Sequence, residues 1–245
     1  MPFSEELYRT RFIERPNKFL LRCSPDDPTK PELKDQVVEA HLPDPGRLKE
    51  LLIPGCYVWL RRAIGHTRKT QWSAVLCQVP DRNELVSLDT TMANRLVAEA
   101  LTEGALTELA GWALHKAEFS HGNSRWDFLL TNARGQKLFL EVKSVTLVVD
   151  RVGLFPDAVT ARGAKHVREL AAIAGGKETQ AAVLFLAQRG DVDLIRPATA
   201  IDPLFAAELV RAAQTGVQIM GRKCLVSTAE IALGEQVPIW LPPGP

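Results

Sequence analysis

Three ionisable residues stand where apolar strand patterns would normally exclude charge. Asp127 lies in the apolar run 124–130, and Glu141 and Lys143 lie in the run 138–143. A buried charge costs free energy unless it is paired or binds a metal ion. An aspartate on one strand and a Glu-x-Lys on the next supply the charges that a metal-dependent phosphodiester site requires.

The two runs also have the spacing of a shared site. Side chains alternate faces along a strand, so Glu141 and Lys143 point the same way, and a hairpin would set Asp127 beside Glu141. Two neighbouring carboxylates repel each other unless a cation lies between them. We therefore expect Asp127 and Glu141 to bind Mg²⁺ or Mn²⁺, together with water and a backbone carbonyl such as that of Val142. With Lys143 polarising a water near a phosphate, Asp127, Glu141 and Lys143 are the candidate catalytic residues.

An ordinary ion-pair ladder on a sheet face would give the same pattern. A Glu-x-Lys triplet arises by chance about once in a chain of this size. Two further acids, Glu99 and Glu118, either extend the cluster or are solvated residues of a helix and a strand end. From spacing alone, the metal site and the ion-pair ladder both remain open.

The elements that must position these residues follow Leu85. Caps, apolar spacing and terminating glycines predict helices over 90–103, 161–174 and 203–215, with strands at 112–119, 125–130, 137–142 and 182–186. The last of these strands is wholly apolar, which is typical of a strand buried on both faces. The order predicts a mixed α/β sheet flanked by helices.

The first 85 residues have a different pattern, of short strands separated by turns. Strands are expected at 19–23, 37–42, 57–61 and 73–78, with a short helix over 45–52 capped by Asp44. This pattern indicates a small β-barrel of the oligonucleotide-binding (OB) kind, although another small β-domain would have the same periodicity. We expect two domains, 1–85 and 86–245.

Basic residues suited to phosphate contact occur in both domains. In the first domain they are interleaved with aromatic residues, an arrangement that suits single-stranded nucleic acid. In the second domain they share a polar helix face with His166 and Glu169. Aromatic residues that fill the barrel core, and a helix face that is merely solvated, are the alternatives. The candidate nucleic-acid-binding residues are Arg11, Arg15, Arg47, Arg61, Arg62, Lys69, Arg162 and Lys165.

Composition adds few constraints. The formal net charge is only +1, so the chain lacks the global basic footprint of many nucleic-acid binders. The four cysteines form no CxxC pair and have apolar neighbours, which predicts reduced, buried thiols. With neither a signal-peptide pattern nor an apolar run near the ~20 residues that span a bilayer, we expect a cytoplasmic protein without membrane contact.

Four sequence blocks resemble a known family. Residues 11–17, 41–48, 140–146 and 155–158 are similar, in order, to blocks of the sugar fermentation stimulation protein A family, and the likeness runs from about residue 3 to about residue 220. The resemblance implies an amino-terminal OB-like barrel and a carboxy-terminal restriction-endonuclease-like domain of the PD-(D/E)xK type. It also implies non-specific DNA binding and a proposed regulatory role in bacterial sugar (maltose) metabolism.

Carried over by position, the nuclease-core residues fall on Asp127, Glu141 and Lys143, with Trp126 where the nuclease signature has proline. We therefore expect an α/β (α+β) protein that binds DNA non-specifically and has a nuclease-like metal pocket. The first alternative is an active Mg- or Mn-dependent endonuclease or exonuclease. The second is a regulator or scaffold whose pocket is vestigial.

Overall fold

The chain divides into two compact units. The computed structural model describes residues 1–26, 36–63, 69–176 and 178–243. The barrel unit comprises Met1–Met92, Gln188–Asp191 and Cys224–Ala232, and the sheet unit comprises Ala93–Ala187, Val192–Lys223 and Leu233–Pro245.

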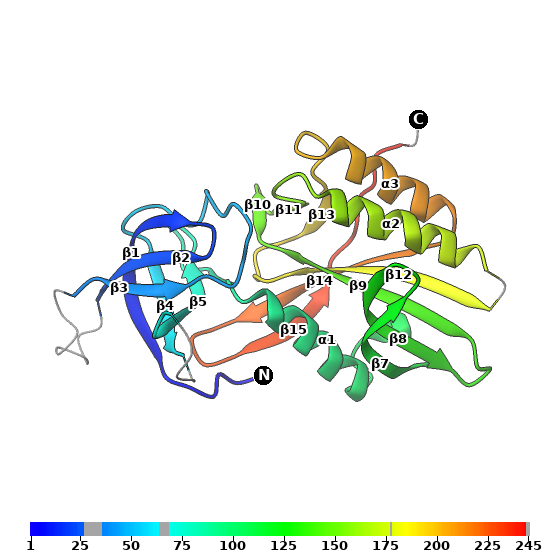
Figure 1. Ribbon diagram of the computed structural model, residues 1–245, viewed down its shortest axis with the longest axis horizontal. Coiled ribbons are helices and arrows are strands. Elements are labelled where there is room, and N and C mark those ends of the chain that lie inside the picture. The colour runs from blue at the N-terminus through cyan, green and yellow to red at the C-terminus, as the bar shows by residue number, and fades with distance from the viewer. Residues whose placement is uncertain (27–35, 64–68, 177, 244–245) are drawn as a thin grey trace. The chain divides into compact units, whose positions relative to one another are not determined.

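The barrel unit is a closed five-stranded barrel (Figure 1). Its strands are β1 (Leu7–Asn17), β2 (Leu20–Pro25), β3 (Val38–His41), β4 (Tyr57–Arg62) and β5 (Trp72–Gln78), and the short strand β6 (Leu85–Ser87) pairs with β5 in antiparallel orientation. The pairing order β1-β2-β3-β5-β4 returns to β1, and only the β3–β5 contact is parallel. Alternate residues such as Leu21, Cys23, Val58 and Leu60 fill the interior. The predicted OB-type barrel is confirmed.

The helix predicted over 45–52 is wrong, because these residues form turns instead. Leu48 has a φ of 50°, in the left-handed region that an α-helix excludes. The Arg15 guanidinium binds the carbonyl oxygens of Gly46 and Arg47, at 2.7 and 2.8 Å, which helical hydrogen bonds would otherwise use. Asp44 caps a tight turn by accepting from the Gly46 N–H at 2.7 Å.

The sheet unit is built on a six-stranded sheet of order β15-β14-β12-β9-β8-β7. Strands β7, β8 and β9 form an antiparallel meander, and β12 runs parallel to β9 and β14. A second sheet of order β10-β11-β13 lies in the same unit. The strands are β7 (Trp112–His121), β8 (Ser124–Asn132), β9 (Lys137–Val145), β10 (Leu147–Val149), β11 (Val152–Phe155), β12 (Thr179–Ala187), β13 (Leu194–Pro197), β14 (Gln218–Val226) and β15 (Ile231–Gln236).

The helices occur where caps and periodicity predict them. They are α1 (Thr90–Glu103), α2 (Ala161–Ala174) and α3 (Pro203–Gln214), with the 3₁₀ helix η2 (Thr107–Leu109) after α1. The Thr160 hydroxyl accepts from the Gly163 N–H at 3.0 Å, and Asp202 Oδ1 accepts from the Phe205 N–H at 2.9 Å. Helices α2 and α3 lie side by side, and α2 packs on β12 over a core that includes Phe185 (Figure 1). The α/β class is confirmed.

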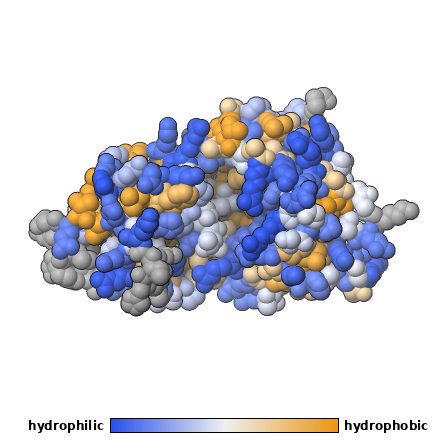
Figure 2. Space-filling view, viewed as in Figure 1, coloured by the Kyte–Doolittle hydropathy of each residue, from blue (hydrophilic) through white to orange (hydrophobic). Residues whose placement is uncertain are grey.

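Hydrophilic residues cover most of the face seen in Figure 2, with small apolar patches between them. Exposed large apolar side chains such as Phe19 and Trp240 are ordinary in number for a globular surface. None of the described helices combines the length and apolarity that crossing a membrane requires. Cys23, Cys77 and Cys224 are buried free thiols, as predicted, whereas Cys56 is only half-buried.

Candidate metal centre

Asp127 is held where the regular pairing of β8 with β9 ends. That pairing runs from Thr131 opposite Lys137 to Phe128 opposite Leu140, so one further step in register would set Asp127 opposite Glu141. There the Asp127 side chain contacts the neighbouring strand, and its Oδ2 accepts the backbone N–H of Val142 at 2.8 Å. The carboxylate of Asp127 therefore lies against the residue that follows Glu141.

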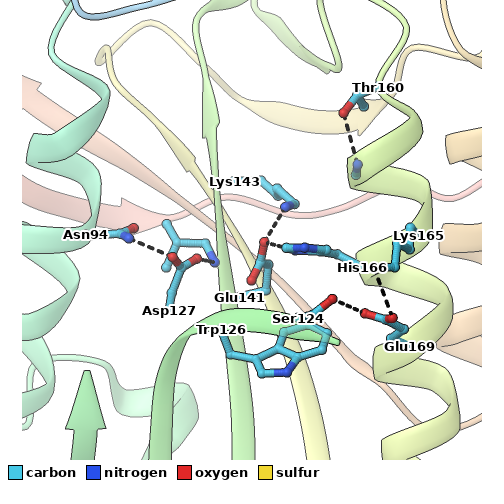
Figure 3. Close-up of polar contacts among 12 residues, drawn as sticks. Asn94, Ser124, Trp126, Asp127, Glu141, Lys143, Thr160, Lys165, His166 and Glu169 are labelled. Atoms are coloured by element: carbon cyan, nitrogen blue, oxygen red, sulfur yellow. Dashed lines mark hydrogen bonds and ion pairs between the residues drawn. The ribbon is translucent and has the colours of Figure 1, made fainter. Parts of the chain in front are cut away.

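Helix α1 supplies the second contact of Asp127. The Asn94 amide donates to Asp127 Oδ1 at 2.7 Å (Figure 3). Burial, and then the negative charge of Glu141, raise the pKa of Asp127 above its usual value, although these two hydrogen bonds and Lys143 oppose the shift. Two carboxylates whose charges interact in this way form a local site of negative potential.

Glu141 is buried, with 5% of its surface exposed, and its two oxygens have unequal environments. Oε1 accepts from Lys143 Nζ at 2.5 Å and lies 2.8 Å from His166 Nδ1, whereas Oε2 is buried without a hydrogen-bond partner among the described residues. Burial alone would raise the pKa of this carboxyl, but His166 and Lys143 outweigh it, so the pKa lies below its usual value. Glu141 is therefore held as a carboxylate.

These groups fit a divalent metal ion. A buried carboxylate oxygen without a partner loses hydration unless a ligand restores it, and Glu141 Oε2 is such an atom. The described residues contain no cluster of three or more His, Cys, Asp or Glu side chains suited to a metal ion. That arrangement does not suit a metal enclosed by protein ligands, but Mg²⁺ and Mn²⁺ sites commonly use one or two carboxylates and complete their shell with water.

The structure brings Asp127, Glu141 and Lys143 into one network and leaves other acids outside it. Glu118 is exposed and pairs with Arg125 at 2.5 Å. Glu99 lies exposed on α1. Neither Glu99 nor Glu118 therefore joins Asp127 and Glu141 as a third acidic residue of the site.

Two residues of the network, Asn94 and His166, are ones that sequence reasoning did not place there. His166 belongs to the polar face predicted on the helix after Thr160, yet it is only 4% exposed. Its ring packs against Trp126, with 5.2 Å between ring centroids. The sequence contains one indication of this position: His166 lies next to Val167 and four residues before Leu170, and both of these are buried. Its place in the helix therefore favours a side chain that points inward.

The other predicted phosphate-binding residues of that helix face lie at the surface. Arg162 and Lys165 are exposed, and Lys165 Nζ lies 3.6 Å from Glu169 Oε1. Glu169 also accepts a hydrogen bond from the Ser124 hydroxyl at the start of β8. Arg162 and Lys165 remain predicted phosphate contacts.

Several of the candidate basic residues of the barrel unit make contacts within the protein. Arg11 pairs with Asp26 at 2.9 Å and lies over the Tyr57 ring, and Arg61 pairs with Asp89 at 3.2 Å. Arg15 binds the turn carbonyls described above. Arg47, Arg62 and Lys69 are exposed, and the Arg62 guanidinium lies over the Trp72 ring, 5.6 Å from its centroid.

An aromatic platform with nearby cations lies at the turn between β1 and β2. Phe19 is 44% exposed, and its ring stacks on His41 at 6.3 Å between centroids with planes 27° apart and lies 4.8 Å from Lys18 Nζ. It lines a hollow of about 600 Å³ together with Asn17, His41 and Lys69. A second hollow of about 450 Å³ shares Asn17 and is lined by four cations: Arg15, Lys18, Arg47 and Lys49. We name this surface the Phe19 platform.

Comparisons with known proteins cover nearly the whole chain. The family model described as "SfsA N-terminal OB domain" matches residues 13–88, and that described as "Sugar fermentation stimulation protein RE domain" matches residues 91–230. The sugar fermentation stimulation protein homologue of Shouchella clausii is 44% identical over 95% of this chain and 97% of its own length. The homologue of Pseudomonas aeruginosa PAO1 is 37% identical over 98% of this chain and all of its own.

A solved structure has the same fold. It is described as the structure of Pyrococcus furiosus SfsA in complex with Ca²⁺, and it matches 98% of each chain with a TM-score of 0.85 at 25% identity. The agreement covers both the OB-type barrel and the mixed α/β sheet.

Proposed function

The chain belongs to the sugar fermentation stimulation protein family, and from that premise we propose that it binds DNA and holds a divalent metal ion at Asp127 and Glu141. The observation that carries the metal site is the buried Oε2 of Glu141, which has no hydrogen-bond partner in the described part of the chain, together with the neighbouring charge of Asp127. The relative solved with Ca²⁺ supports a preference for cations with oxygen ligands.

In the proposed site, Asp127 and Glu141 hold Mg²⁺ or Mn²⁺, and water completes the shell. A bound ion would supply charge to a phosphate oxygen and lower the pKa of a bound water. The protein's own contribution is to hold the two carboxylates in fixed positions where water has little access. Asn94 and the Val142 N–H fix one carboxylate, and Lys143 with His166 fixes the other.

The Phe19 platform supports contact with single-stranded DNA. An exposed aromatic ring offers a stacking surface to any base, and surrounding cations neutralise phosphates without reading sequence. Arg47, Lys49 and Lys69 line hollows beside that ring. We therefore propose that binding is non-specific in sequence and places the protein with the chromosome, in the cytoplasm.

One pair of titrations tests this function. Fluorescence anisotropy with a labelled single-stranded oligonucleotide should give an affinity that falls with salt, by a log–log slope of about 0.7 per phosphate contacted. A duplex of the same sequence serves as the comparison. Calorimetric titration with Mn²⁺ should show one site. Salt-insensitive binding overturns the DNA assignment, and absence of Mn²⁺ binding overturns the metal assignment.

A second candidate function, cleavage of DNA, is favoured by Lys143. Its ammonium group lies 2.5 Å from Glu141 Oε1 and its side chain is only 12% exposed, so a cation stands beside the proposed metal ion. Such a group would orient a water or stabilise charge on the phosphate in the transition state. Incubation of DNA with Mn²⁺ should then give products that EDTA and Asp127→Asn both abolish. Unchanged cleavage in Asp127→Asn would contradict the assignment.

A regulatory role in maltose metabolism would act through the same DNA contacts. Loss of the Phe19 platform should then change expression of a maltose-responsive reporter in cells, as deletion of the whole gene should. A reporter that responds to the deletion but not to Phe19→Ala would separate regulation from this surface.

A further inference from the structure

His166 makes a buried contact with the proposed metal site from a different element. It lies on α2, while Glu141 and Lys143 lie on β9, and its Nδ1 is 2.8 Å from Glu141 Oε1. Both side chains of the contact are 6% exposed. Water therefore has little access to weaken or replace this hydrogen bond.

The distribution of donors on Glu141 is uneven. Lys143 Nζ and His166 Nδ1 both approach Oε1, and Oε2 has no partner among the described residues. A carboxylate that served only as the anion of a buried ion pair would lose less free energy if its two donors were shared between both oxygens. Placing both donors on Oε1 leaves Oε2 available to a ligand.

The His166 ring is fixed by its neighbours. Trp126 packs against it at 5.2 Å between centroids, with planes 45° apart, and Trp126 is itself only 1% exposed. Trp126 directly precedes Asp127 on β8. The dipeptide Trp126-Asp127 thus has two roles (Figure 3). Asp127 is one proposed metal ligand, and Trp126 packs against His166, which contacts the other proposed ligand, Glu141.

We propose that His166 is a positioning residue that binds Oε1 of Glu141 and thereby holds Oε2 toward the metal ion. The inference rests on the proposed function, because it assigns a role within the same site. Hydrogen bonds to ligating carboxylates orient them, and loss of such a partner typically costs about 10–100-fold in metal affinity.

A matched pair of variants tests this role. His166→Asn keeps an N–H donor at the position of Nδ1, and His166→Leu has nearly the same size without a donor. We expect Mn²⁺ affinity, measured by calorimetry and by the EPR signal of free Mn²⁺, to fall about 10–100-fold in His166→Leu and to recover largely in His166→Asn. His115→Leu, at an exposed position of β7, should bind Mn²⁺ as the wild type does.

The outcomes separate the inference from the function beneath it. Wild-type affinity in His166→Leu overturns the positioning role alone, and equal losses in the Leu and Asn variants assign His166 to packing instead. Absence of Mn²⁺ binding by the wild-type protein overturns the metal site and the inference together. If His166→Leu does not fold, His166→Gln takes its place, because the longer side chain carries its amide beyond the position of Nδ1. Equal Mn²⁺ affinities of His166→Gln and His166→Asn would then contradict the positioning role.

Discussion

The two units place their charges in opposite ways. On the barrel unit, the Phe19 platform presents exposed cations around an exposed ring. In the sheet unit, Asp127 and Glu141 are largely buried within a network of side chains from α1, β8, β9 and α2. Exposed cations bind a polyanion by releasing its counterions, which requires little geometry. Buried carboxylates lose hydration and regain it only from a ligand that fits.

This contrast predicts that the two units can be disabled separately, and the largest effect belongs to the sheet unit. Glu141→Gln replaces a carboxylate oxygen of the proposed metal site with an amide, so we expect Mn²⁺ affinity to fall by more than about 100-fold. Binding of single-stranded DNA in EDTA should be unchanged. Calorimetry and anisotropy measure the two quantities.

The exposed, Arg125-paired Glu118 provides the control for that variant. Glu118→Gln carries the same chemical change and should bind Mn²⁺ normally. If both variants lost metal binding equally, the loss would reflect overall negative charge, and the contrast between a buried and an exposed acid would be wrong.

The next effect separates structural from ligand-binding cations within the barrel unit. Arg15→Met removes a guanidinium that binds three turn carbonyls at 2.7–2.8 Å, those of Gly46, Arg47 and Lys18. We expect the free energy of unfolding to fall by about 2 kcal/mol, as for hydrogen bonds to charged groups. Lys69→Met, at an exposed position, should leave stability unchanged. Urea denaturation gives both values, and equal stabilities would contradict the distinction.

A smaller effect tests the platform itself. Phe19→Ala removes the exposed ring, and since base stacking contributes about 1–3 kcal/mol per base, affinity for single-stranded DNA should fall about 10-fold. The salt dependence should stay the same, because no phosphate contact is lost. Trp240→Ala, another exposed aromatic, is the control. Unchanged affinity in Phe19→Ala would contradict the stacking role of this ring.

The smallest effect concerns stability without metal. The raised pKa of Asp127 means that its ionised form destabilises the fold at neutral pH, and this cost disappears as pH falls through that pKa. In EDTA at pH 7, we expect Asp127→Asn to raise stability by about 1 kcal/mol, a Tm increase of about 2–4 °C.

The pKa of Glu141 is shifted in the opposite direction to that of Asp127, so its effect on stability is also opposite. Its lowered pKa gives stability that is present above the unfolded-state value, roughly pH 4.3, and is lost as pH falls through the folded-state value. Glu141→Gln should therefore lower Tm at pH 7 and flatten its decline in acid. Thermal scans from pH 3 to pH 7 check both variants, and equal slopes for Glu141→Gln and the wild type would contradict the assignment.

Local patterns predicted much of this fold. The caps Thr160 and Asp202 mark helix starts correctly, and the apolar run in β12 is a buried strand, as its composition predicts. Alternation along β8 and β9 identified Asp127, Glu141 and Lys143 as charges inside buried strands. These features depend on residues near one another in sequence.

What the sequence did not reveal depends on distant partners. The helix expected over 45–52 is prevented by Arg15, about 30 residues earlier along the chain. His166 and Asn94 join the site from α2 and α1, by contacts with Glu141 and Asp127 that no local pattern reveals. Strands β14 and β15 join the sheet with no strong alternation of their own, since their burial is mixed.

The hydrogen bond between the Asp127 carboxylate and the Val142 N–H has an evolutionary implication. An alanine there would leave a main-chain donor without its acceptor, so selection for a sound sheet alone suffices to retain an acceptor side chain. A homologue without the proposed metal site can therefore still carry this aspartate. Under the proposed function, Glu141 is the better marker of a retained metal site, because its Oε2 has no hydrogen-bond partner among the described residues.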